Sequence, residues 1–212
     1  MKKTNDLSGL VKNGFENING NFDPMIFADS KVIDVLRVEI RKYFSKADRI
    51  GNYSSYSLKH KAERHIGTYV SNGEFIYAMN LEGFEISRDS INCHFNIKDS
   101  DVLVFSHAIK ILNKLSKPLA ANIDEYISVI KVYQKYKYNL KFIIDNNFLY
   151  ERRLKRDVLK VLAKEIDEDL PVIDYWVNML QDDKTTIPNE KMDMLGKLFN
   201  LPSNQLVNNR KK

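Results

Sequence analysis

Apolar side chains recur every three or four residues along most of this chain, which is the spacing of one face of an α-helix. Glycine and proline, which interrupt helices and supply tight turns, contribute only 8 and 5 of the 212 residues. A β-sandwich or β-barrel needs many such turns. The sequence therefore predicts a mainly α, multi-helix fold.

A first helix is expected after Ser30, which has the side chain of a good N-cap. Further helices are expected at 58–66, 72–83, 102–115, 122–136, 138–149, 152–166, 171–180 and 189–200. One segment has a different period, because apolar and polar residues alternate along 91–97. That alternation predicts at most a short strand or hairpin there, with Cys93 as a small buried side chain.

We expect four parts along the chain. Residues 1–24 are rich in Asn, Gly and Asp and predict a flexible arm. Pro118 lies between two expected helices and marks the boundary between an N-terminal helical domain, 25–117, and a C-terminal helical domain, 118–207. Residues 208–212 form a basic tail.

The sequence also narrows the environment of the protein. With Cys93 as its only cysteine, the chain cannot form an intrachain disulfide. The basic N-terminus lacks the apolar core of a signal peptide, and no apolar stretch approaches the ~20 residues of a membrane span. We therefore expect a cytoplasmic protein that makes no membrane contact.

The charge is divided into blocks. Residues 41–64 hold seven Lys and Arg against two acidic residues, and 131–160 hold nine against three. Residues 161–183 reverse this balance, with seven acidic residues against one lysine. Basic blocks of this kind create local potentials that attract polyanions.

Tyrosines are interleaved with the cations in both basic blocks, and this mixture suits phosphate contact and base stacking. The candidate nucleic-acid-binding residues of the first block are Arg41, Lys42, Lys46, Arg49, Tyr56, Lys59, His60, Lys61 and Arg64. Those of the second block are Lys131, Lys135, Lys137 and Lys141. The alternative is that the tyrosines are half-buried on a core face while the lysines are simply solvated.

Catalytic chemistry has little support in the sequence. His60 and Glu63 lie three residues apart on an expected helix, so both could reach one metal ion or act as an acid and base. Zinc-protease, phosphate-loop and nucleophile-elbow motifs are all missing from the sequence. We therefore expect no enzyme activity, no metal and no cofactor.

The last third of the chain has a distinctive order of apolar and polar residues. The residues that carry this order are Ala163, Ile166, Ile173, Trp176, Pro188 and the run MLGKLFNLPSNQL at 194–206. Over roughly 140–207 the chain resembles the helix-turn-helix domain of Cro/CI-type repressors. The resemblance implies a three-helix core closed by Leu195, Leu198, Phe199, Leu201 and Leu206, with a recognition helix near 171–180.

Carboxylates surround that expected recognition helix. The acidic residues are Asp167, Glu168, Asp169, Asp174, Asp182 and Asp183. Duplex DNA carries one charge per ~1.7 Å of its axis, so these side chains oppose its approach. Use of the same fold for a protein contact therefore stays open.

The central segment 54–84 is similar to a pattern of uncharacterised phage- and plasmid-borne proteins, through SYSLKHKAE and YVSNGEFI. Our first hypothesis is a mobile-element accessory protein that binds nucleic acid, with DNA favoured over RNA, and that regulates transcription. The alternative is an anti-defence protein that inhibits a host protein complex through its charged surfaces. Whether the protein is a homodimer stays open.

Overall fold

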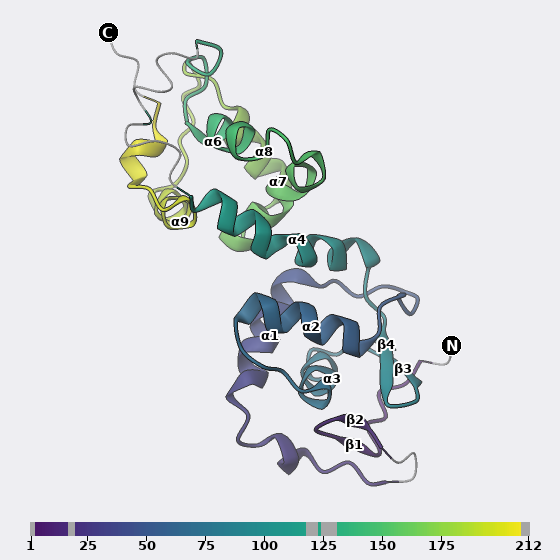
Figure 1. Ribbon diagram of the computed structural model, residues 1–212. Coiled ribbons are helices and arrows are strands. Elements are labelled where there is room, and N and C mark those ends of the chain that lie inside the picture. Colours follow the sequence, from purple (N-terminus) through teal and green to yellow (C-terminus); the bar gives the residue numbers. More distant parts are fainter. Residues whose placement is uncertain (1–2, 17–19, 118–122, 124–130, 209–212) are drawn as a thin grey trace. The chain divides into compact units, whose positions relative to one another are not determined.

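The computed structural model describes residues 3–16, 20–117, 123 and 131–208. The chain forms two compact units, Met1–Ser106 and His107–Lys212 (Figure 1). The described residues are mainly helical, as predicted, and the strands among them form two small sheets of two strands each. The division falls inside helix α4 (Asp99–Leu115), earlier than the expected boundary at Pro118, which itself lies outside the described residues.

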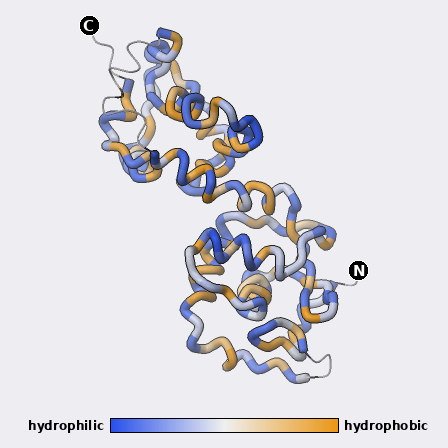
Figure 2. Tube along the Cα trace, in the orientation of Figure 1, coloured by the Kyte–Doolittle hydropathy of each residue, from blue (hydrophilic) through white to orange (hydrophobic). Residues whose placement is uncertain are grey.

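The N-terminal unit is built from two antiparallel hairpins and a group of helices. The hairpins are β1 (Leu10–Val11) with β2 (Gly14–Phe15), and β3 (Ile86–Asp89) with β4 (Asn92–Phe95). The helices are the 3-10 turn η1 (Pro24–Phe27), α1 (Lys31–Tyr43), α2 (Ser55–Ile66) and α3 (Asn72–Leu81). The tube in Figure 2 shows polar and apolar stretches alternating along the helices, as expected of amphipathic elements.

Helix α3 lies at the centre of this unit, in contact with α1, α2 and β2. Phe75, Ile76, Ala78 and Met79 are all fully buried, so α3 is covered on most of its circumference. At its start Gly73 donates a backbone hydrogen bond to the Lys12 carbonyl, and a Cβ there would lie only 2.0 Å from the Val11 oxygen. The central helix of the unit is therefore mainly a packing element, with Leu81 exposed at its end.

The segment expected to be a flexible arm is packed where it is described. Leu7, Leu10 and Phe15 are buried, and Thr4 forms a β-bridge with Ile86. Arg88 donates to the carbonyls of Asp6 and Ser8, and its guanidinium carbon lies 4.2 Å from the Phe15 ring centre. The prediction missed this because the anchoring partner lies about 80 residues further along the chain.

The predicted strand signal at 91–97 is confirmed as the hairpin β3–β4, in which Ile86 pairs with Phe95. Cys93 and Phe95 are buried, whereas Ile91 lies in the turn and is 44% exposed. Burial raises the pKa of the Cys93 thiol far above its usual value. Cys93 is therefore a packing residue.

The C-terminal unit contains α6 (Leu140–Asn147), α7 (Arg152–Ile166), α8 (Leu170–Asn178), α9 (Asn189–Phe199) and the 3-10 turn η2 (Ser203–Leu206). Most of the expected helix 122–136 lies outside the described residues, and its last part forms turns at 131–135 and a β-bridge from Tyr136 to Leu180. Asn208, assigned to the tail, is buried and donates to the carbonyls of Tyr133 and Tyr136.

Helices α7 and α8 are joined by a three-residue turn, Asp167–Asp169, in which Asp167 adopts the left-handed conformation. Ala163, Ile166, Ile173 and Trp176 are buried along these two helices. Of the expected closing residues, Leu195, Phe199 and Leu206 are buried, and Leu198 and Leu201 are half-buried. No described helix has both the length and the apolar character needed to cross a membrane.

A capping box fixes the start of α3 and makes stability depend on pH. Glu74 accepts hydrogen bonds from the Ser30 hydroxyl at 2.6 Å and the Ser71 amide at 2.8 Å, while Ser71 caps the Glu74 amide. Burial alone would raise the pKa of Glu74, but these hydrogen bonds outweigh it and leave the pKa below the usual 4.5.

Replacing Glu74 with Gln is expected to lower the free energy of unfolding by about 1 kcal/mol near neutral pH. Because the pKa is lowered by folding, the contribution of the carboxylate is complete above its unfolded pKa and is lost as the pH falls through its folded pKa. Urea unfolding of both proteins from neutral to acid pH measures this. The two stabilities should converge in acid, and a constant difference would contradict the assignment.

Candidate nucleic-acid interface

Helix α2 carries about half of the candidate residues of the first basic block, 41–64, which we call the first zone; the second block, 131–160, is the second zone. The helix places these candidate residues on two different faces. The helix starts at a Ser54 side-chain cap and ends at Gly67 in the left-handed conformation. Ser55, Leu58, Lys59 and Ala62 are buried on the inner face. We call the group on the other sides of the helix, together with Tyr53 just before it, the α2 surface. In this group Tyr56 and Arg64 are exposed, and Tyr53, His60 and Lys61 are half-buried.

Lys59 was predicted to contact phosphate, but it belongs to the interior. It is 5% exposed, and its ammonium donates to Glu63 Oε1 at 3.0 Å and to the Val70 carbonyl at 3.1 Å. The rings of Tyr56 and Tyr69 lie 5.3 and 5.1 Å from it. This charge is neutralised inside the fold and is not available at the surface.

Glu63 fixes the end of α2 to the segment that leads into α3. Besides Lys59, it accepts the Val70 amide at 3.2 Å and faces His60 Nδ1 at 2.5 Å through its second oxygen. Burial favours the neutral acid, but the hydrogen bonds from Lys59, Val70 and His60 prevail and lower the pKa of Glu63. The carboxylate therefore stays ionised and holds the imidazole in one orientation.

His60 is a half-exposed, oriented imidazole. The Tyr56 ring meets it edge-on, with 4.5 Å between ring centres. His60 and Glu63, which the sequence placed three residues apart on one helix, contact each other directly, and Glu63 also accepts from two other donors. Among the described residues there is no group of three or more His, Cys, Asp or Glu side chains that could hold a metal ion.

Lys61 and Arg64 are the two cations of the α2 surface that form no ion pair with a described residue. Lys61 lies with its ammonium 5.9 Å from the Tyr53 ring, and the exposed Arg64 donates only to the His60 carbonyl, at 3.1 Å. Partial burial and, after it, the neighbouring charge of Arg64 lower the pKa of Lys61. Neither side chain has a carboxylate partner in the described part of the chain, so an anion between them would relieve their repulsion.

The remaining candidate residues of the first zone lie outside α2. Two of them form ion pairs within the fold and two are exposed. Arg41 shares Glu82 with Arg37, at 2.9 and 2.6 Å, and Lys42 lies 3.9 Å from Glu39. The exposed Lys46 has its ammonium 5.7 Å from the Phe84 ring. Arg49 is exposed beside a pocket of about 330 Å³ that Lys3, Asp48 and Ile50 also line.

The second zone is divided in the same way. Lys137 donates to the carbonyls of Asp183 and Thr185 at 2.7 and 2.6 Å, and Lys141 lies 3.9 Å from Asp145. Lys131 and Lys135 are exposed, and Lys135 lies 5.2 Å from the Tyr136 ring centre. Two of the four predicted lysines therefore support the C-terminal unit and two face solvent.

Tyr133, in the same zone, is also part of the internal packing. Its hydroxyl donates to Asp145 at 3.1 Å, and Asp145 also receives Lys155 at 2.7 Å. Burial, followed by the Asp145 charge, raises the pKa of Tyr133 to about 12. The tyrosine therefore stays neutral at physiological pH.

Three exposed arginines were not among the predicted contacts: Arg152, Arg153 and Arg156 on α7. Within the described residues none of the three has an ion-pair partner. The signal was present as the positive charge of 131–160. The three arginines were not predicted individually, because the alternation of Lys and Tyr favoured residues 131–141 of the same block.

The α8 face has the opposite character. Asp174 and Tyr175 are exposed, and the Tyr175 hydroxyl donates to Asp183 at 2.5 Å. This hydrogen bond to the carboxylate raises the pKa of Tyr175 and lowers that of Asp183. The helix expected from the sequence to be a recognition helix therefore presents Asp174 and a phenol that is hydrogen-bonded to Asp183.

The chain matches no protein-family model, no curated protein and no solved structure. Function is therefore inferred from the residues themselves.

The division between inner and outer cations can be tested by unfolding. Lys59→Ala leaves Glu63 without its buried partner and is expected to lower the free energy of unfolding by about 3 kcal/mol. Lys61→Ala removes an outward charge and should change it by no more than about 0.5 kcal/mol. Urea titration of both variants at neutral pH measures this, and equal losses would contradict the division.

Proposed function

We propose that the protein binds nucleic acid through the α2 surface. One observation carries this proposal: Lys61 and Arg64 lie together at the surface without an acidic partner among the described residues, while Lys59 on the same helix is neutralised. Neighbouring positive charges at a surface create a local potential that attracts anionic ligands. A phosphate backbone supplies the missing negative charge.

The aromatic residues beside these cations support the same ligand. Tyr53 lies against Lys61, and Tyr56, which is 53% exposed, lies against His60. Cations with neighbouring rings and hydroxyls are typical of surfaces that contact sugar and phosphate. Such contacts carry little sequence information, so we propose affinity without strong base preference for this surface, with DNA favoured over RNA.

We also propose a biological role, which rests on sequence likeness and on the α7–α8 pair. The likeness of 54–84 to phage- and plasmid-borne sequences supports a mobile-element accessory protein, and the α7–α8 pair supports a transcriptional regulator. In that case α8 would not enter the major groove, because Asp174 faces outward on it.

A specific observation favours a second candidate function, contact with a host protein. Leu170, Tyr175 and Leu180 are between 41% and 47% exposed around the acidic α8 face. Exposed apolar side chains rimmed by charge are typical of protein interfaces. We propose this face, and not the α2 surface, as the place of any anti-defence contact.

The nucleic-acid proposal can be tested with the double variant Lys61→Ala/Arg64→Ala. We expect weaker binding to a random duplex, and a log–log salt slope that falls by about 1 for each phosphate that these side chains neutralise. Fluorescence anisotropy with a labelled duplex over a series of salt concentrations measures both. The matched control is Lys12→Ala/Lys31→Ala, which removes the same charge from two exposed positions of the same unit.

Binding that is equally weakened in the control would mean that only net charge matters, which would overturn the assignment to the α2 surface. Lack of wild-type binding at micromolar protein and low salt would overturn the nucleic-acid function itself. A stoichiometric complex from a host lysate that α8 substitutions abolish would then establish the second candidate.

A further inference from the structure

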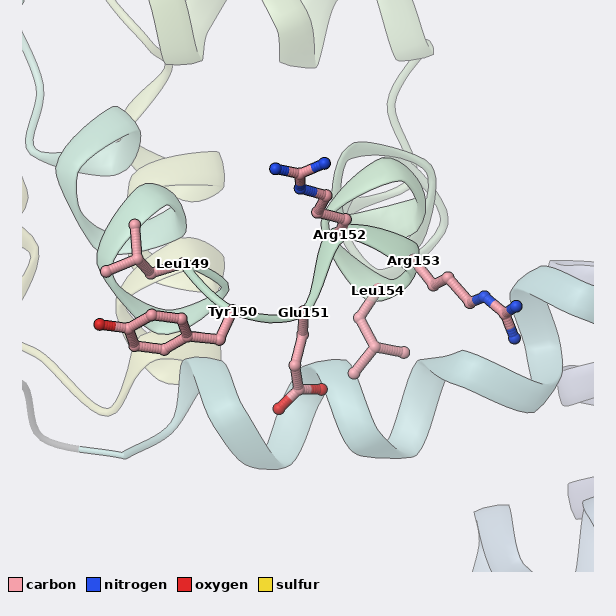
Figure 3. A pocket seen from close by; sticks show the side chains of 6 residues that line it. All are labelled: Leu149, Tyr150, Glu151, Arg152, Arg153 and Leu154. Carbon is pink, nitrogen blue, oxygen red and sulfur yellow. The ribbon is translucent and has the colours of Figure 1, made fainter.

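The turn between α6 and α7 borders an open pocket of about 530 Å³ in the C-terminal unit. Leu149, Tyr150, Glu151, Arg152, Arg153 and Leu154 line it (Figure 3). Its volume lies within the roughly 300–1,000 Å³ of small-ligand sites. Tyr150 is 92% exposed and Leu149 61%, so the turn holds a phenol ring almost entirely in solvent and leaves more than half of an aliphatic side chain exposed.

The charge around this pocket is positive. Arg152 and Arg153 are exposed, and Arg156 follows one turn later on the same face of α7. The acidic side chain of the lining, Glu151, is bound by Lys114 at 2.5 Å and points toward α4, away from Arg152 (Figure 3). The arginines are therefore not neutralised by the acid next to them in the sequence.

Folding gives no reason for this arrangement. A tyrosine that keeps 92% of its surface in water gains almost nothing from the hydrophobic effect. Arginines in the first turn of a helix also oppose its dipole, and the acid at the N-cap of α7, Glu151, is paired with Lys114. Local choices that conflict with stability are expected at functional positions.

We propose that this pocket binds one nucleotide of a single-stranded nucleic acid. The exposed face of Tyr150 stacks with the unpaired base, and Arg152 and Arg153 contact the flanking phosphates. Base pairs in a duplex are stacked on one another and do not offer a free face to the ring, so the site selects single strands. This inference rests on the proposed nucleic-acid function but concerns a different surface and a different form of the ligand.

The test is anisotropy with a fluorescein-labelled ten-residue oligothymidylate and the full-length protein. Tyr150→Ala is expected to weaken binding at least about fivefold, and Tyr150→Phe, which keeps the ring, to retain it. Arg152→Ala/Arg153→Ala should lower the salt slope by about 0.7 for each phosphate that the two arginines neutralise. Because these side chains are exposed, unchanged thermal unfolding verifies that the variants are folded.

Matched controls lie in the same unit. Tyr175→Ala removes another exposed tyrosine and Lys184→Ala/Lys197→Ala removes two other exposed charges, and both should bind as the wild type does. Duplex binding should be insensitive to Tyr150→Ala. An equal loss for duplex and single strand, or for Tyr150→Ala and Tyr175→Ala, would overturn the proposal.

Two further results separate this inference from the proposed function. If the oligonucleotide binds and Lys61→Ala/Arg64→Ala weakens it while Tyr150→Ala does not, the function stands and this site is wrong. If free thymidine monophosphate binds Tyr150 as tightly as the oligonucleotide does, the site is one for free nucleotides and the strand proposal is overturned.

Discussion

The Glu63 carboxylate accepts from donors in two parts of the N-terminal unit, and the surface above it depends on those bonds. One oxygen accepts both the Lys59 ammonium and the Val70 amide, so the last turns of α2 are held against the segment that leads into α3. The other oxygen faces His60. Helix α2 packs against the enclosed helix α3, so one side of α2 is buried. Because Glu63 fixes the end of α2 in this position, Lys61 and Arg64 lie on the sides that remain open to solvent.

The same principle explains how the two basic blocks divide. Cations that pair with a carboxylate or with carbonyls of a distant segment stabilise the fold, as Arg41 does at Glu82 and Lys137 at two backbone oxygens. The cations without such partners among the described residues include Lys61 and Arg64 on α2 and the three arginines of α7, and also Lys46, Arg49, Lys131 and Lys135 elsewhere. Removing a paired cation is expected to lower the stability of the fold, whereas removing an unpaired cation is expected to weaken association with an anionic ligand.

Local signals were sufficient to predict the helices. The 3.6-residue spacing and the caps located α1, α3, α7 and α9 within a few residues, since both act over one or two turns. The packed N-terminal segment and the burial of Lys59 could not be predicted, because their partners Arg88 and Val70 are set by tertiary contacts. For the same reason charge density predicted where cations gather, but not that Arg152, Arg153 and Arg156 have no ion-pair partner in the described part of the chain.

The central claim is that association is mediated by the cations that the fold does not neutralise. Titrating the ¹⁵N-labelled protein with a single-stranded oligonucleotide, and following its amide and side-chain NMR signals, tests this most directly. We predict that the largest shifts cluster at residues 53–64 and 149–156, while those of Arg37, Arg41 and Glu82 remain small. Shifts centred on α8, or spread evenly over paired and unpaired cations, would contradict it.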